Sequence, residues 1–128
     1  MALDFAGVAG RVDTGRCGYH AGVAAENGVA ADYARRGYPL LARRWRGRSG
    51  EIDLVLRDGD GVIVVEVKKS RNFDRAVERL SQRQIGRLLR AGEEFLGTMP
   101  RGSLTDIRFD VALVNGHGEI RVIENALC

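Results

Sequence analysis

The sequence contains few cysteine, histidine and aromatic residues, and each scarcity argues against a class of function. Aromatic residues make up 6% of the 128 residues, too few for a surface on which successive bases stack. The two cysteines, Cys17 and Cys128, form no CxxC pair and are accompanied by only two histidines, so no zinc site is expected. We expect free thiols in a reducing compartment, which favours the cytoplasm.

Long apolar runs are missing as well. No stretch approaches the ~20 apolar residues that cross a bilayer. The N-terminal segment lacks the basic start and the apolar centre of a signal peptide. We therefore expect no membrane partner. The length of 128 residues, with 45% hydrophobic and 29% charged residues, instead predicts one soluble globular domain with a single core.

Lysine is rare, and the arginines that replace it are unevenly distributed. Of the 20 basic residues, only Lys68 and Lys69 are lysines, and six arginines but no acidic residue lie between Tyr33 and Gly50. Because guanidinium groups suit phosphate oxygens, we interpret this segment as a surface that faces a polyanion. A second set recurs at helical spacing, where a solvated helix face is an equal alternative: Arg75, Arg79, Arg83, Arg87 and Arg90.

Apolar periodicity predicts a helix, three strands, a second helix and two further strands. Residues 1–19, rich in Gly and Ala, are expected to form a flexible tail before a domain at 20–128, and residues 72–80 have no clear pattern. The helices are expected at 20–36 and 81–97, and the strands at 39–46, 51–57, 62–69, 106–114 and 119–124. This order predicts a single α/β domain with a mixed sheet flanked by helices.

The second helix begins with a capping box, in which Ser81 is the N-cap and Gln84 is the third helical residue. A helix N-terminus also attracts phosphate, which gives Gln84 a second candidate role beside a substrate. For two other carboxylates, Glu26 and Asp110, the sequence leaves two alternative roles each. Glu26, on the apolar stripe of the first helix, could be an outer metal ligand or could reach solvent or an arginine. Asp110 could be a polar edge residue or the structural partner of an arginine.

The turn sequence DGDG at 58–61 predicts a hairpin with a two-residue loop, and its register decides which side chains meet. This register gives one face made only of apolar pairs, which are Ile52–Val67, Leu54–Val65 and Leu56–Ile63. On the other face Asp53 lies opposite Glu66, and Glu51 lies opposite Lys68.

Two opposed carboxylates repel, because the Cβ atoms of such pairs lie about 4.5–5.5 Å apart. Either one carboxylate holds a proton or a cation lies between them, and Mg²⁺ suits a site with one or two carboxylates plus substrate phosphate. Lys68 emerges on the same face as Glu66 and could hold a water or balance charge on a phosphate. These groups can hydrolyse a phosphodiester with a divalent ion. The alternative is an exposed polar face with an ion pair between Glu51 and Lys68.

The segment GEIDLVLRDGDGVIVVEVKKS, which begins at Gly50, resembles the signature of the YraN-like family, small bacterial proteins of the restriction-endonuclease-like superfamily. The similarity covers residues 20–126 and includes the first helix, the arginine stretch, the capped second helix and the RFDV segment that begins at Arg108. Many members of that family have a lysine at the position of Gln84 and a small polar residue at the position of Lys69.

The resemblance implies an αβββαβ core in which Asp53, Glu66 and Lys68 carry the Asp and Glu-x-Lys of the PD-(D/E)xK nucleases. In related Holliday-junction resolvases a helix glutamate joins the metal site, and Glu26 matches that position. The same resemblance implies that the protein is a Mg²⁺- or Mn²⁺-dependent endonuclease that acts on structured or branched DNA.

Other expectations concern the partners of such a nuclease. The residues expected to contact the substrate are Arg44, Arg46, Arg48, Glu51, Arg83, Gln84 and Arg87. A homodimer would suit symmetric cutting of two strands. Two alternatives stay open: a nucleic-acid-binding protein whose nuclease site is inactive, and a protein-interaction partner that keeps the fold as a scaffold.

Overall fold

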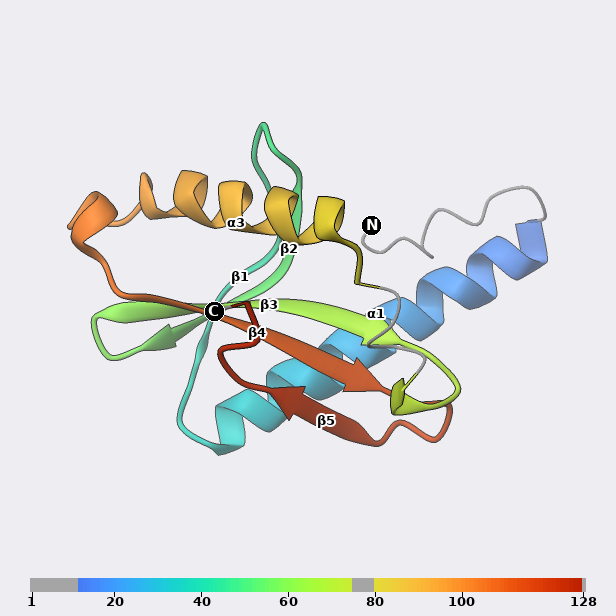
Figure 1. Cartoon of the computed structure of the whole chain (residues 1–128). Helices are drawn as coiled ribbons and strands as arrows, with labels where there is room; N and C mark the ends of the chain where they lie inside the picture. The colour runs from blue at the N-terminus through green and yellow to red at the C-terminus, as the bar shows by residue number, and fades with distance from the viewer. Residues whose placement is uncertain (1–11, 75–79, 128) are drawn as a thin grey trace.

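The computed structural model of the protein describes residues 12–74 and 80–127 and shows a five-stranded sheet with a helix on each face (Figure 1). Its elements are α1 (Val12–Arg35), β1 (Leu40–Arg46), β2 (Glu51–Asp58), β3 (Gly61–Lys69), α3 (Gln82–Leu96), the 3-10 turn η2 (Gly102–Leu104), β4 (Ile107–Val114) and β5 (Ile120–Ile123). The predicted α/β class with an αβββαβ core is confirmed. No helix in the described ranges is both long and apolar enough to span a bilayer.

The first helix is longer than predicted. It begins at Val12, well before the expected start at His20, so residues 12–19 are helical. The remainder of the predicted tail, residues 1–11, lies outside the described residues. The early turns of α1 project beyond the sheet (Figure 1). A helix segment that covers no sheet needs no apolar stripe, so apolar periodicity could not reveal it.

The strands lie in chain order across the sheet, and the β2–β3 hairpin has the predicted register. Leu54 pairs with Val65 and Leu56 with Ile63. Strands β3 and β4 run parallel, whereas the other neighbouring pairs are antiparallel. Parallel neighbours need a long crossover, and α3 lies within that connection.

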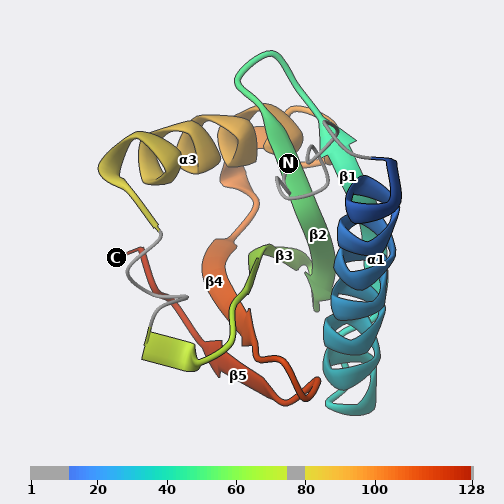
Figure 2. The ribbon, with the colours of Figure 1, turned by 90° about the vertical axis from the view of Figure 1, so that its right-hand side faces the viewer.

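The sheet is covered on both faces, which explains why β2 and β3 are apolar almost throughout. Figure 2 shows α1 and α3 on opposite sides of the sheet. The cluster beneath α1 includes Ala25, Val29, Tyr33, Leu54, Leu56, Ile63, Val65 and Val67. The cluster beneath α3 includes Ile52, Val55, Val62, Val64, Leu88, Ala91 and Phe95.

One part of the predicted hairpin is wrong. Ile52 was expected on the same face as Leu54, but it packs in the cluster beneath α3 and pairs with Trp45 of β1. The backbone pairing between β2 and β3 runs from Asp58 only as far as Leu54. Beyond that point β2 continues beside β1, so its alternation is no longer tied to β3.

The start of α3 agrees with the predicted capping box. The backbone N–H of Gln84 donates to Ser81 Oγ at 3.2 Å, and the backbone N–H of Ser81 donates to Gln84 Oε1 at 3.0 Å. The preceding segment was expected to be irregular, but Phe73 and Asp74 are helical, and residues 75–79 lie outside the described residues.

Candidate functional site

The candidate site begins where β2 leaves β3. Asp53 is the next residue after the last backbone pair of these strands, and its side chain is fully buried. Its Oδ2 accepts a hydrogen bond from the backbone N–H of Val67 at 2.8 Å. A side-chain oxygen therefore joins the two strands at the point where their backbone pairing ends, and this bond directs the carboxylate towards β3.

Asp53 has an unfavourable electrostatic environment. Burial raises its pKa well above the usual range, and the neighbouring carboxylates of Glu66 and then Glu26 raise the pKa further, against the opposing effect of the Val67 N–H. No donor in the described part of the chain reaches Asp53 Oδ1, which is buried. Asp53 and Glu66 can therefore form a hydrogen bond to each other only if they share a proton. The alternative is a cation that both carboxylates bind.

Lys68 lies beside this pair of carboxylates. Its Nζ is 3.1 Å from Glu66 Oε2, and the two side chains are only 16% and 13% exposed. Because successive side chains of a strand point to opposite faces, Glu66 and Lys68 lie on the face opposite Val65 and Val67, which pack beneath α1. Glu66 thus neighbours both of the other residues: its carboxylate raises the pKa of Asp53 and pairs with Lys68. The catalytic roles expected of the three residues stay predictions.

Glu26 lies next to this group but has its own cationic partners. Its side chain is 1% exposed, and its Oε1 accepts a hydrogen bond from Arg44 Nε at 3.0 Å. Arg43 approaches the same oxygen at 3.7 Å. Of the roles left open by the sequence, the structure shows contact with arginine. The expectation that Glu26 is a metal ligand stays a prediction.

The backbone of Arg44 is strained. Its φ of +47° lies in the left-handed region that non-glycine residues rarely adopt. In the register of β1 and β2, Arg44 lies between the pairs Arg43–Leu54 and Trp45–Ile52, and so beside Asp53. The strained conformation accompanies the bond that holds the guanidinium of Arg44 on Glu26.

The carboxylates of Asp53 and Glu66 suit a divalent ion that takes few of its ligands from the protein. Within residues 12–74 and 80–127, no three His, Cys, Asp or Glu side chains gather as a complete metal cage. Mg²⁺ commonly takes one or two carboxylates and completes its coordination with water and substrate phosphate. The buried Oδ1 of Asp53 and the adjacent Glu66 supply the oxygens that such a site needs.

Glu51 does not lie opposite Lys68 as the predicted register had it, and the ion pair between them, considered as an alternative, is not the one that forms. Glu51 pairs with Arg46 of β1, and the Arg46 Nη2 to Glu51 Oε2 distance is 3.5 Å. Lys68 instead pairs with Glu66. The cause is again that β2 turns from β3 to β1 at Asp53, which carries Glu51 away from β3.

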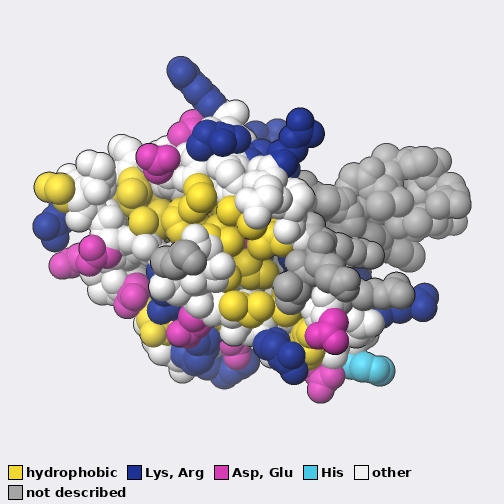
Figure 3. Space-filling view, in the orientation of Figure 1, with side chains coloured by type: hydrophobic (Ala, Val, Ile, Leu, Met, Phe, Trp, Pro, Cys, Tyr) yellow, Lys and Arg dark blue, Asp and Glu magenta, His cyan; other side chains and the backbone are white. Residues whose placement is uncertain are grey.

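Several candidate substrate residues lie on the β1–β2 hairpin and on α3. Arg46 and Arg48 are exposed on the hairpin, and Arg83 and Arg87 are exposed on α3. Figure 3 shows Lys and Arg side chains gathered over the hairpin and the adjoining turns of α3. Gln84 serves the helix cap. Arg75 and Arg79, which the helical spacing included, lie outside the described residues.

Asp110 is the structural partner of an arginine, one of the two roles considered for it. Arg108 donates to both of its oxygens at 2.9 Å, and Tyr33 Oη donates to Oδ2 at 2.6 Å. Burial and the bond to Asp110 raise the pKa of the Tyr33 hydroxyl. Because these bonds join α1 to β4, Asp110 has a structural role and adds nothing to the acidic pair.

Sequence reasoning missed Glu94 of α3. Its carboxylate accepts backbone N–H groups from Arg48 and Ser49, which lie in the β1–β2 turn. A glutamate on the polar side of an amphipathic helix gives no local sign of such a distant partner, so the sequence offered no usable signal.

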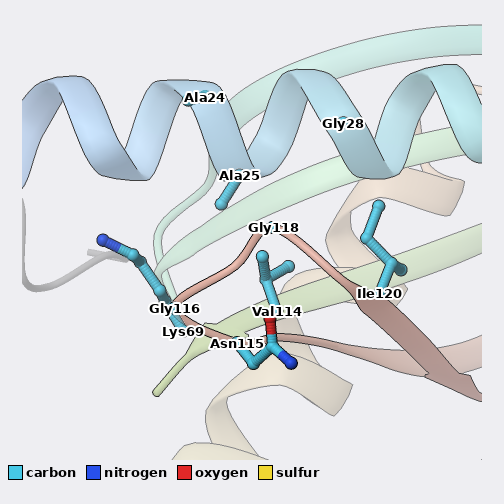
Figure 4. A pocket seen from close by; sticks show the side chains of 9 residues that line it. All are labelled: Ala24, Ala25, Gly28, Lys69, Val114, Asn115, Gly116, Gly118 and Ile120. Atoms are coloured by element: carbon cyan, nitrogen blue, oxygen red, sulfur yellow. The ribbon is translucent and has the colours of Figure 1, made fainter. Parts of the chain in front are cut away.

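A cavity of about 240 Å³ lies between α1 and the β4–β5 turn (Figure 4). The small residues Ala24, Ala25 and Gly28 leave this space, and Lys69 and Asn115 lie at its edge. No acidic side chain is among the described residues that line it. Lys69 follows Lys68 in β3 and so points to the other face of the sheet, which separates this cavity from the acidic pair.

Comparisons with known proteins agree on one family. The model of the uncharacterised protein family UPF0102 matches residues 25–114, which extend from α1 to the end of β4. A UPF0102 protein of Ruegeria pomeroyi is 60% identical over 106 residues, covering 83% of this chain and 86% of that protein. A UPF0102 protein of Roseobacter denitrificans is 53% identical over 117 residues, 91% of each chain. A third, from Cereibacter sphaeroides, is 55% identical over 113 residues, 88% of this chain and 97% of that protein.

Proposed function

The chain belongs to the UPF0102 family, and on that premise we propose that it is a divalent-metal-dependent endonuclease acting on structured or branched DNA. The observation that carries the proposal is the buried Oδ1 of Asp53, which has no hydrogen-bond donor among the described residues, near the carboxylate of Glu66, which in turn pairs with the ammonium of Lys68. Two buried carboxylates destabilise a fold unless a proton or a cation lies between them. The resemblance to the restriction-endonuclease-like superfamily supports the same assignment.

Each residue has a distinct part in the proposed reaction. Asp53 and Glu66 would hold Mg²⁺ or Mn²⁺, and such an ion polarises a phosphate and lowers the pKa of a bound water. Lys68 would hydrogen-bond the attacking water and balance the negative charge that develops on the phosphate. Its ion pair with Glu66 keeps the ammonium at the place where this charge appears.

The substrate class rests on the arginines near the site. Phosphate contacts position a nucleic acid and give no sequence preference, which suits an enzyme that recognises the shape of its substrate. Arg44, beside Asp53, could contact the phosphate nearest the cut, and Arg46, Arg48, Arg83 and Arg87 could contact flanking phosphates. A cytoplasmic location and a homodimer stay predictions.

A cleavage assay tests the proposal directly. Labelled junction, flap, single-stranded and duplex DNA are incubated with the protein in Mg²⁺, in Mn²⁺ and in chelator. We expect ion-dependent cleavage of a branched substrate, lost by about 10²-fold or more in Lys68→Met, because removal of one preorganised charge-stabilising group costs that much. Lys69→Met is the matched control, since it changes the adjacent lysine on the opposite face. Equal loss in both variants, or no cleavage of any substrate, would refute the proposal.

A second candidate is a nucleic-acid-binding protein that does not cut. The pairing of Glu26 with Arg44 favours it, because the acidic residue expected to complete the metal site is already neutralised. This function predicts strongly salt-dependent DNA binding, no stabilisation by Mn²⁺, and unchanged affinity in Glu66→Ala. The nuclease proposal predicts stabilisation by Mn²⁺ that is lost in Glu66→Ala.

A further inference from the structure

The carboxylate of Glu94 in α3 binds the turn between β1 and β2 through hydrogen bonds. Glu94 Oε1 accepts the backbone N–H of Ser49 at 2.8 Å, and Glu94 Oε2 accepts the backbone N–H of Arg48 at 2.9 Å. The bonds from Ser49 and then Arg48 lower the pKa of Glu94, so it stays ionised near neutrality. Figure 1 shows the β1–β2 hairpin rising past α3.

The turn approaches its neighbours so closely at two glycines that a side chain there would clash. A Cβ on Gly47 would meet Glu94 Oε1 at 2.9 Å and the ring of Trp45 at 2.8 Å, and a Cβ on Gly50 would meet Arg87 Cδ at 2.8 Å. Gly50 also has a φ of +147°, which disfavours any other residue. The two glycines therefore let the turn approach the side chains of α3 closely.

An aromatic contact holds the base of the same hairpin. Trp45 of β1 packs edge-to-face on Phe95 of α3, with ring centroids 5.3 Å apart. Since Phe95 directly follows Glu94 in α3, adjacent residues hold both the stem and the tip of the hairpin. The position of the tip relative to α3 is thus constrained by Glu94 and Phe95 and, about two helical turns earlier, by Arg87.

The contact also leaves the arginines of the hairpin directed outward. Glu94 bonds to the backbone of Arg48, while the Arg48 side chain is exposed. Arg46 has 79% of its side chain exposed. Arg87 lies against Gly50, on the α3 side of the turn. The turn therefore has three exposed arginine side chains on it or beside it.

We propose that Glu94 is a positioning residue for the substrate: it fixes the hairpin tip so that Arg46, Arg48 and Arg87 bind the backbone phosphates of a nucleic acid that flanks the acidic pair. This inference rests on the proposed function. A fixed tip lowers the entropy lost when its arginines engage phosphate. Glu94 acts through the loop and contacts no substrate itself.

The test compares two neighbouring glutamates of α3. Glu93 is exposed, and Glu93→Gln removes the same charge as Glu94→Gln. General electrostatics predicts that both variants bind DNA more tightly, because both make the protein more basic. If Glu94 positions the tip, Glu94→Gln should instead weaken binding and raise the Kd for a labelled branched DNA about three- to tenfold. Glu94→Asp, which keeps the charge but shortens the side chain, should also raise the Kd, whereas Glu93→Asp should not.

The salt dependence of binding supplies a readout that a change in folding would not imitate. Each phosphate contact contributes about 0.7–0.9 to the slope of log Kd against log salt. Glu94→Gln should lower this slope by about one to two and Arg48→Ala by about one, and the double variant should lose little more than Glu94→Gln alone. Amide exchange should accelerate at Arg48 and Ser49 and stay as in the wild type in the β2–β3 pairing.

The outcomes separate this inference from the function on which it rests. If Glu93→Gln and Glu94→Gln change the Kd alike, or amide exchange in the turn is unchanged, Glu94 does not position the tip, while DNA binding by the wild type still supports the proposed function. If the wild type binds no DNA at low salt, both the inference and the proposed function are wrong.

Discussion

Replacing Asp53 with asparagine should stabilise the protein without added ions and remove its response to divalent ions. The side chain of Asp53 is fully buried, and its Oδ1 has no hydrogen-bond donor among the described residues. Asparagine has nearly the same shape and keeps an oxygen for the Val67 N–H. Its amide group can donate to Glu66, so a repulsive contact becomes a hydrogen bond.

The size of the effect follows from the cost of an unsatisfied buried polar group. That cost is about 1–3 kcal/mol, and more for a charged group. A gain of this size raises the melting temperature of a domain of this length by roughly 3–10 °C. In contrast, a divalent ion at a hundred times its Kd should stabilise the wild type by about 2.7 kcal/mol and the variant far less.

The advantage of Asp53→Asn should grow as the pH rises from acid to neutral. Burial and Glu66 raise the pKa of Asp53 in the folded protein, so the folded state keeps its proton to a higher pH than the unfolded state. Above the unfolded pKa of about 4, the unfolded chain releases its proton first, and wild-type stability falls until the folded pKa is passed. Below about pH 4 both states are protonated and the penalty disappears.

Urea and thermal unfolding at acid and neutral pH, with and without Mn²⁺, would measure these changes. Asp60→Asn is the matched control, because it makes the same substitution at an exposed turn residue. If Asp53→Asn unfolds more easily than the wild type at neutral pH, the buried carboxylate does not lower the free energy of unfolding, and the reasoning is wrong. Equal stabilisation of both proteins by Mn²⁺ would show that Asp53 is not a ligand.

Three further substitutions test other contacts. Tyr33→Phe removes the 2.6 Å bond to buried Asp110 and should lower the free energy of unfolding in urea by about 1–2 kcal/mol; an unchanged value would show that the bond adds nothing net. Ser81→Ala removes the side-chain cap of α3 and should cost about 1 kcal/mol, with amide exchange accelerated in the first turn and not in the last. Glu26→Gln replaces the charge-assisted bond from Arg44 Nε at 3.0 Å by a neutral one and should cost about 1–3 kcal/mol in the same urea assay, whereas a more stable variant would show that desolvation outweighs the pairing.

The parts of the fold that the sequence predicted depend on neighbours in the chain. The DGDG turn and the apolar alternation of its flanks determine the β2–β3 register as far as Leu54. The capping box at Ser81 needs only residues within one helical turn. Local rules of this kind brought Glu66 and Lys68 to one face of β3 and placed Asp53 opposite that strand.

The parts that the sequence did not reveal depend on contacts between distant segments. The turn of β2 away from β3, which moves Ile52 to the other face, accompanies the side-chain bond from Asp53 to Val67. The left-handed backbone of Arg44 accompanies a bond to a helix eighteen positions earlier in the chain. Glu94 reaches a turn 45 and 46 positions away. Neither periodicity nor turn chemistry contains information about such pairs.

Two fully buried aspartates of this chain provide an internal comparison. Asp110 receives two hydrogen bonds on each carboxylate oxygen, from Arg108 on both, from Tyr33 on Oδ2 and from the backbone of Asn125 on Oδ1. Among the described residues Asp53 receives one, from the backbone of Val67, and the carboxylate of Glu66 raises its pKa.

Among the described residues, both oxygens of Asp110 therefore have hydrogen-bond donors, whereas Oδ1 of Asp53 has none. Folding alone accounts for Asp110, because its bonds tie α1 to β4, whereas burial and Glu66 raise the pKa of Asp53 and disfavour its ionised form. Strain of this kind persists where function requires it. Because a bound cation and the phosphate it carries would satisfy Asp53 Oδ1, the contrast between the two aspartates argues for a metal site at Asp53 independently of any family resemblance.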